Sequence, residues 1–307
     1  MSILVVGSIA LDSVETPFGT AEEALGGAAV YFSYAASFFN RVRLVGVIGE
    51  DFPEEHLNLL EGRNIDLAGL EHSHGNTFRW KGRYDYDLNE AHTLDTQLNV
   101  FETFSPRIPE SFKDSDFVFL ANIQPELQLQ VAQQVNSPRI IACDTMNFWI
   151  EGAYDQLRET LKSVDILVIN DAETRELARE PSLVKAARQI LEWGPKTLVV
   201  KRGEYGVLMF HGNSVFSAPA YPLEEVFDPT GAGDTFAGGF MGFLSTQEEI
   251  SEASIRQAII FGSTLASFNV EDFSLGRMKT LEMQDILDRF AEFKTLSHFE
   301  EVESENL

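Results

Sequence analysis

The sequence has 307 residues, of which 44% are hydrophobic, and it carries 48 acidic and 23 basic side chains. The length suits one large α/β domain, or such a domain with a small appendage. The formal net charge of −25 argues against nucleic acid and anionic membranes as partners. The single cysteine, Cys143, excludes an internal disulfide and is typical of a reducing compartment. The first apolar stretch, residues 3–11, is too short to span a bilayer, so we expect a soluble cytoplasmic protein.

Short apolar runs alternate with segments of helical spacing along the chain. The runs cover 3–6, 42–48, 117–121, 139–143, 165–169, 197–200 and 206–210. Runs that are apolar throughout are typical of strands buried on both faces of a parallel sheet. Helical segments include 53–60, 126–135 and 255–268. This order predicts an α/β fold with helices on both faces of a mainly parallel central sheet.

Residues 77–87 form the clearest single strand, because aromatic and charged side chains alternate along it. We expect a turn at 89–92 and a partner strand at 96–101. A two-stranded ribbon is marginal in isolation, so it needs a substrate, another subunit, or both against its aromatic face. Arg79 lies on the charged face, where contact with a polar substrate and a solvated surface are equally open.

The most specific stretch is the run from Asp228 to Gly239, Asp-Pro-Thr-Gly-Ala-Gly-Asp-Thr-Phe-Ala-Gly-Gly, which precedes an apolar helix. Gly231 and Gly233 allow a tight turn and a close approach of backbone N–H groups to a ligand. The unpaired N–H groups of a first helical turn suit an anion such as a phosphoryl group. Asp234 at this corner is either a helix cap or a base that takes a proton from an attacking hydroxyl.

This run resembles the C-terminal signature of the PfkB/ribokinase family of carbohydrate and nucleoside kinases, Asp-Thr-x-Gly-Ala-Gly-Asp. The resemblance extends from Gly7 to about Asp272. It implies a ribokinase-like three-layer αβα sandwich with a small β-ribbon lid. The kinase domain would cover 1–299, with lid segments at about 12–24 and 76–104. The acidic tail, 300–307, is expected to be disordered.

The resemblance also implies an ATP-dependent kinase. Asp234 would be the general base, and the N–H groups of Gly231, Ala232 and Gly233 would form an anion hole for the transferred phosphoryl group. Residues expected on the substrate side are Asp12, Gly26, Gly27, Arg79, Asn122 and Asn147. The family's asparagine near position 29 or 30 is replaced by Ala29 and Val30. This departure argues against a ribokinase-like substrate.

The nucleotide side is expected to contain Asn170, Glu173, Lys201, Gly203, Gly206 and Thr230. Asn170 and Glu173 match an Asn-x-x-Glu motif whose acid organises Mg²⁺ through water; the same residues would also cap a helix. Lys201 replaces the family's usual threonine and remains compatible with phosphate contact. Some members bind a monovalent cation, here K⁺, near Asp228 and the segment 269–272.

Neither a P-loop nor a Rossmann glycine pattern is present. The leading interpretation is a kinase for a hydroxyl of a sugar or sugar-like polyol, and the sequence resembles myo-inositol kinases in its glycine motifs. A nucleoside kinase is the alternative, since the aromatic strand could stack a base. A non-catalytic ligand-binding member of the fold is a third reading. The ribbon would also provide a homodimer contact.

Overall fold

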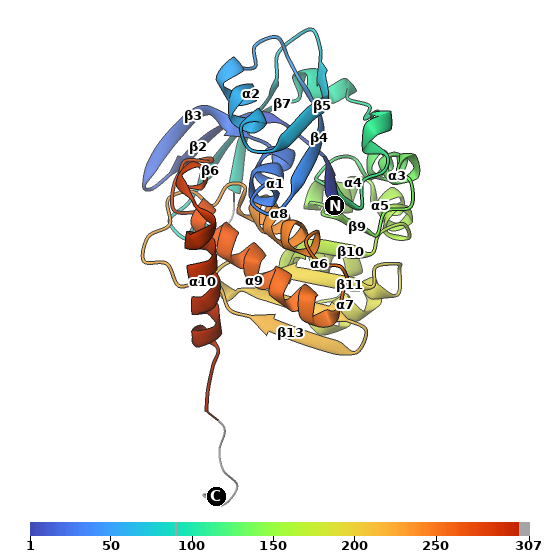
Figure 1. Ribbon diagram of the computed structural model, residues 1–307, viewed down its shortest axis with the longest axis vertical. Helices are drawn as coiled ribbons and strands as arrows, with labels where there is room; N and C mark the ends of the chain where they lie inside the picture. Colours follow the sequence, from blue (N-terminus) through green and yellow to red (C-terminus); the bar gives the residue numbers. More distant parts are fainter. Residues whose placement is uncertain (90, 301–307) are drawn as a thin grey trace, which may run out of the picture.

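The computed structural model describes residues 1–89 and 91–300, and within them nine strands form one main sheet (Figure 1). Its order is β13-β12-β11-β10-β9-β8-β1-β4-β5, and only β11-β12-β13 run antiparallel. The strands are β1 (Ser2–Val6), β4 (Arg41–Ile48), β5 (Ile65–His72), β8 (Phe117–Leu120), β9 (Ile140–Cys143), β10 (Ile166–Asn170), β11 (Thr197–Lys201), β12 (Val207–His211) and β13 (Ser214–Ala218). The predicted mainly parallel sheet is confirmed.

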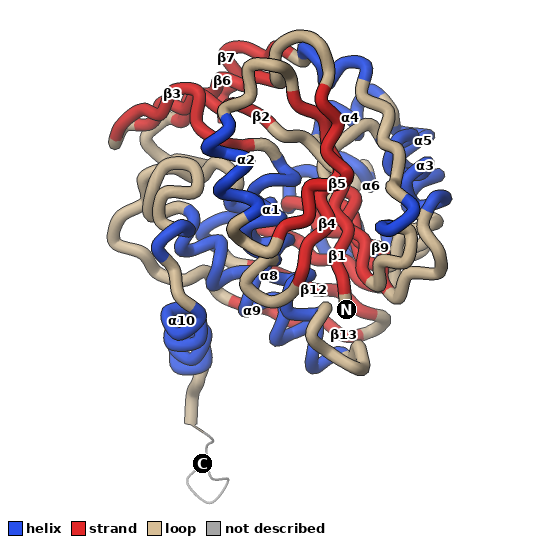
Figure 2. Tube along the Cα trace, turned by 45° about the horizontal axis from the view of Figure 1, so that its top comes forward, coloured by secondary structure: helices blue, strands red, loops and turns tan. Residues whose placement is uncertain are grey.

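Helices cover both faces of this sheet, as Figure 2 shows. One face packs against α1 (Ala28–Ala36), α2 (Glu54–Glu61), α8 (Ala232–Leu244), α9 (Glu252–Asn269) and α10 (Met283–Leu296). The other packs against α3 (Pro125–Gln134), α4 (Asn147–Gly152), α5 (Tyr154–Leu161), α6 (Asp171–Ala178) and α7 (Leu183–Leu191). Ile3 and Val5 of β1 point to the first layer, and Leu4 and Val6 to the second. Continuous apolar strands are therefore buried on both sides. No helix in 1–89 or 91–300 is long and apolar enough to cross a membrane.

A second, four-stranded sheet, called here the small sheet, has the order β3-β2-β6-β7. Its strands are β2 (Ala10–Thr16), β3 (Gly19–Gly26), β6 (Phe78–Tyr84) and β7 (Ala91–Gln97). The sequence analysis placed lid segments in both parts of the chain but predicted strands only in the second. In Figure 1 the small sheet lies beyond the end of the main sheet at which α1 begins.

The predicted partner strand at 96–101 is wrong in its position. β7 ends at Gln97, and residues 99–103 form a 3₁₀ turn that begins with Asn99 at a φ of 49°. Val100 is buried and Phe101 stacks on Phe78, with ring centroids 5.3 Å apart. These apolar side chains pack under the small sheet, so their burial ends the strand. β7 is exposed along its whole length, and the dimer contact through it stays a prediction.

α1 and α8 pack closely, and glycines permit this approach. A Cβ on Gly238 would overlap the carbonyl oxygen of Phe32, and one on Gly242 would lie 3.0 Å from Cα of Ala36. α1 begins directly after Gly27, and α8 begins directly after Gly231. The packing of these two helices therefore places the start of α8 beside the start of α1.

We expect Gly238→Ala to lower the free energy of unfolding by about 1–3 kcal/mol, because the added methyl group must displace the α1 backbone. Urea denaturation followed by circular dichroism measures this change. Gly152→Ala is the matched control, since a Cβ there meets nothing within 4 Å. Equal stability of the two variants would contradict close α1–α8 packing.

Candidate active site

The site is built around the first turn of α8. Gly231 is the N-cap residue with a φ of 73°, and a Cβ on it would overlap the ring of Tyr31. In the described chain, the N–H groups of Gly231 and Gly233 have no acceptor, whereas the N–H of Ala232 donates to the carbonyl oxygen of Pro229, 3.1 Å away. Ala232 thus closes the turn and the two glycines offer free donors, while the anion hole formed by the three residues stays a prediction.

Asp234 lies in the first turn of α8 and makes no capping hydrogen bond, because the N-cap is a glycine. The helix-cap alternative is therefore wrong. Burial raises the pKa of Asp234 to about 6, and the positive charge of Lys201 opposes that rise. A carboxylate with this pKa is ionised at neutral pH and is basic enough to accept a proton from a hydroxyl.

Asp12 lies on β2 and is 5% exposed. Burial raises its pKa to about 7; the N–H of Gly27 works against this rise, and the charges of Asp228 and Asp234 add to it. A Cβ on Gly26 would overlap Oδ2 of Asp12, so only glycine fits there. The predicted residues Asp12, Gly26 and Gly27 thus come together beside the start of α8.

The small sheet connects directly to the α8 loop. The hydroxyl groups of Tyr84 and Thr230 are hydrogen-bonded at 3.3 Å, and burial raises the pKa of Tyr84 to about 12.

Trp80 is the register partner of Asp12, so both side chains share the face turned toward this loop. Its indole ring lies over Gly82, and its Nε1 donates to Oγ1 of Thr93 at 3.2 Å. The sequence analysis assigned no site role to Tyr84 or Tyr31, and only the aromatic alternation in β6 pointed to Tyr84.

Arg79 lies apart from this cluster. It alternates with Trp80 along β6 and therefore faces the opposite side of the small sheet from Asp12. Its guanidinium pairs with Glu23 at 2.8 Å and with Asp51 at 2.7 Å. Arg79 therefore forms ion pairs between the small sheet and the loop after β4, and its predicted contact with a substrate stays a prediction.

Asn122 and Asn147 lie at the carboxyl ends of β8 and β9. Oδ1 of Asn122 accepts a hydrogen bond from Nε1 of Trp149 at 3.0 Å, and Asn147 is exposed as the first residue of α4. Their contact with a substrate stays a prediction.

The nucleotide side, as predicted, begins with a capping box. Oδ1 of Asn170 accepts from the N–H of Glu173 at 2.7 Å, and Oε2 of Glu173 accepts from the N–H of Asn170 at 2.9 Å. Burial raises the pKa of Glu173, and Lys201 opposes that rise. The capping role is confirmed. Oε1 of Glu173 takes no part in the capping hydrogen bonds.

Asp144 directly follows Cys143, the last residue of β9. It is 5% exposed, and its Oδ1 has no hydrogen-bond partner within the described residues. Burial raises the pKa of Asp144 well above its usual value, and the charge of Asp234 adds to the rise. An orphaned carboxylate oxygen beside a second acid, Glu173, fits a hard cation such as Mg²⁺. Residues 1–89 and 91–300 contain no group of three or more His, Cys, Asp or Glu side chains that could hold a metal ion.

Gly203 and Gly206 both adopt positive φ angles, 53° and 81°. A Cβ on Gly206 would overlap the carbonyl oxygen of Ala218, so this glycine is required by the turn itself. A Cβ on Gly203 would lie 3.7 Å from Oδ1 of Asn89 in the β6–β7 turn. The small sheet therefore reaches the nucleotide-side loop at one end and the α8 loop along β6.

Asp228 and Thr230 join the α8 loop to the segment after α9. Oδ1 of Asp228 accepts from the N–H of Thr230 at 2.9 Å, and its Oδ2 accepts from the N–H of Ser274 at 3.4 Å. Asn269 donates to the carbonyl oxygen of Thr230 at 2.9 Å. The segments predicted to hold a monovalent cation are thus adjacent, but hydrogen bonds explain their arrangement, and the cation stays a prediction.

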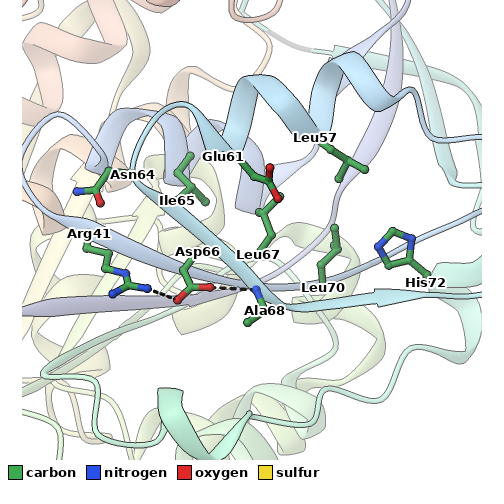
Figure 3. Close-up of a pocket in the computed structure, with 10 residues that line it drawn as sticks. All are labelled: Arg41, Leu57, Glu61, Asn64, Ile65, Asp66, Leu67, Ala68, Leu70 and His72. Atoms are coloured by element: carbon green, nitrogen blue, oxygen red, sulfur yellow. Dashed lines mark hydrogen bonds and ion pairs between the residues drawn. The ribbon is translucent and has the colours of Figure 1, made fainter.

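A hollow with a volume of about 610 Å³ lies elsewhere, along the edge strand β5 and helix α2 (Figure 3). An ion pair between Arg41 and Asp66 crosses it, and none of the site residues above lines it. Its titratable lining includes Glu61, Asp66 and His72, but no helix begins among its lining residues, so it lacks the glycine turn and helix N-terminus found at α8.

Comparison with known proteins identifies the family. The profile described as pfkB family carbohydrate kinase matches residues 2–280, nearly the whole chain. The chain belongs to the pfkB family of carbohydrate kinases. The expectation drawn from the signature run is thereby confirmed, together with the ribokinase-like fold.

Relatives within the pfkB family carry different names. A cytidine kinase of Thermococcus kodakarensis is 31% identical over 258 residues, which cover 82% of this chain and 91% of that protein. An inositol 3-kinase of Arabidopsis thaliana is 21% identical over 298 residues, 93% and 78% of the two chains. The structure of a Methanocaldococcus jannaschii nucleoside kinase superposes with a TM-score of 0.76 at 19% identity, covering 95% and 98%.

We expect Asp12→Asn to stabilise the unliganded protein at pH 8 by about 1–2 kcal/mol. The pKa of Asp12 is higher in the folded than in the unfolded chain, so the folded state binds more protons and stability falls as pH rises from about 4 to about 7. Replacing the Asp12 carboxylate with an amide removes this pH-dependent loss of stability. Thermal unfolding at pH 5 and pH 8 measures the stability of both proteins, and the difference between them should shrink at pH 5.

Glu15→Gln, an exposed change on the same strand, is the control and should leave both melting temperatures unchanged. If Asp12→Asn instead destabilises the protein at pH 8, the burial of an ionised Asp12 is not a cost to the fold.

Proposed function

We propose that this protein transfers the γ-phosphoryl group of ATP to a hydroxyl group of a sugar or sugar-like polyol, with Asp234 as general base. The observation that carries the proposal is the position of Asp234 in the same helical turn as the free N–H donors of Gly231 and Gly233. A base and an anion site a few ångströms apart suit in-line attack of a hydroxyl on a phosphoryl group.

Each residue then has one task. Asp12 accepts a hydrogen bond from a hydroxyl of the acceptor, and Gly26 and Gly27 leave room for that contact. Asp234 takes the proton from the attacking oxygen while its bond to the γ-phosphorus forms and the bond to the ADP oxygen breaks. The N–H groups of Gly231 and Gly233 stabilise the phosphoryl oxygens during transfer. The small sheet excludes water and limits hydrolysis of ATP.

On the nucleotide side, Asn170, Lys201, Gly203 and Thr230 are the candidates for contact with ATP. Asp144 and Glu173 would hold Mg²⁺, Glu173 through water, and the ion would neutralise phosphate charge. Asp228 is the candidate neighbour of a K⁺ ion. Cytoplasmic location and a dimer through β7 remain part of this proposal, and sizing chromatography tests the latter.

A nucleoside is the second candidate for the acceptor, and the position of Trp80 favours it. Trp80 is the cross-strand neighbour of Asp12 on the face of the small sheet turned to the α8 loop, where a flat base could stack while Asp12 binds the ribose. The cytidine kinase relative supports the same reading. A non-catalytic protein is disfavoured, because Asp234, Glu173 and the glycine turn are all retained.

We expect ADP release from ATP and Mg²⁺ to depend on one class of acceptor in a panel of pentoses, hexoses, inositols and nucleosides. Asp234→Asn should lower kcat by about 10²–10⁴-fold, because proton abstraction is lost, and should leave ATP affinity nearly unchanged. A coupled ADP assay and calorimetry measure the two quantities. Equal loss of turnover and ATP binding would make Asp234 a structural residue.

The pH profile gives an independent check. Asp12 and Asp234 must both be ionised, and their pKa values are raised to about 7 and about 6. We therefore expect kcat/KM to fall as pH drops below about 7 and to fall more steeply below about 6. In Asp12→Asn the break near pH 7 should disappear while the one near pH 6 remains. A flat profile from pH 5 to 8 would contradict the assignment of both carboxylates.

A further inference from the structure

Lys201 points its ammonium group at the first turn of α8. It is the last residue of β11, and its register partner is Asn170 of β10, so it lies at the carboxyl edge of the sheet. A Cβ on Gly233 would lie 2.6 Å from Nζ of Lys201, 3.7 Å from Cε and 3.9 Å from Cδ. The lysine therefore approaches the glycine with its tip, and the missing side chain of Gly233 makes the room.

The helix N-terminus by itself repels the ammonium group of Lys201. The N-terminus of a helix carries a partial positive charge, and a second positive charge beside it is repelled. Across residues 1–89 and 91–300, Nζ of Lys201 makes no hydrogen bond and no ion pair within 4.0 Å. An ammonium group and the free N–H groups of Gly231 and Gly233 thus share one region with no anion between them.

Nearby carboxylates hold the lysine in place from a distance. Burial raises the pKa values of Asp144, Glu173 and Asp234, and the Lys201 charge opposes each of these rises. The ammonium group therefore lies among three acids without pairing to any of them. A cation balanced in this way keeps its three donors for an incoming anion.

We propose that Lys201 is a catalytic residue whose ammonium group binds the transferred phosphoryl group, together with the N–H groups of Gly231 and Gly233. This inference rests on the proposed phosphoryl transfer and adds a charged member to its anion site. During transfer the proton of the acceptor hydroxyl goes to Asp234 and the ADP oxygen leaves. Lys201 stays protonated throughout and balances the negative charge on the phosphoryl oxygens.

The role also explains why Asp234 can lie next to a phosphate site. Two anions at one helical turn repel each other, and a cation between them reduces that repulsion. Lys201 is placed for this by β11, whereas an uncharged threonine in the same position could only donate a hydrogen bond.

The test compares Lys201→Met, Lys201→Arg and the control Lys196→Met. Lys196 immediately precedes β11, its side chain is 76% exposed, and it pairs only with Asp165. Calorimetry with Mg²⁺ measures binding of ADP and of the β,γ-methylene analogue of ATP, and a coupled assay measures kcat and KM. Thermal unfolding confirms that each variant folds.

We expect Lys201→Met to lower kcat by about 10²–10³-fold with a smaller change in KM for ATP. It should weaken the ATP analogue about tenfold and leave ADP almost unchanged, because only the former carries the transferred group. Lys201→Arg should recover part of the loss, and Lys196→Met should match the wild type.

Unchanged kinetics in Lys201→Met, or equal weakening of ADP and the ATP analogue, would overturn the proposal, since the lysine would then be idle or a general nucleotide contact. Failure of the proposed function looks different: the wild type and Asp234→Asn would both release no ADP with any acceptor. The calorimetric comparison of ADP with the ATP analogue would still decide the contact of Lys201.

Discussion

The burial of several carboxylates around one helical turn is the constraint on which this site depends. Asp12, Asp144 and Asp234 are all buried, the charge of Asp234 acts on both of the others, and burial raises the pKa of each. Like charges in a low-dielectric region are costly unless donors or cations compensate them. The helix N-terminus and Lys201 supply part of that compensation, and bound substrates would supply more. Burying these carboxylates lowers the stability of the fold but keeps together the groups that the proposed chemistry needs.

The close packing of α1 and α8 sets the position of the α8 turn. α1 and α8 approach each other through Gly238 and Gly242, which brings Tyr31 under Gly231. The turn before α8 is thereby held in a left-handed conformation, and its N–H groups remain exposed to a ligand. A bulkier helix interface would move the donors away from Asp12, even with every polar residue of the site unchanged.

The small sheet joins the two halves of the site. It carries Asp12 and Trp80 on one face, bonds to the α8 loop through Tyr84, and reaches the nucleotide-side loop through Asn89. Arg79 on the other face ties the sheet to Asp51 beyond β4. A substrate bound as proposed at Asp12 would therefore contact an element that also touches the α8 turn, which suits a reaction that must exclude water.

Apolar periodicity and the local run from Asp228 to Asp234 were enough to predict the parallel sheet and the family. The same run also points to Asp234 as the base, and that role stays a prediction. The sequence missed β2 and β3, because polar residues interrupt the apolar pattern in both strands. It placed β7 wrongly because Val100 and Phe101 are apolar for burial and not for pairing. Only the tertiary structure brought Tyr84 to Thr230, which are 146 residues apart. The same holds for Lys201 and Gly233. Such contacts depend on how separate elements pack, and no local sequence pattern predicts them.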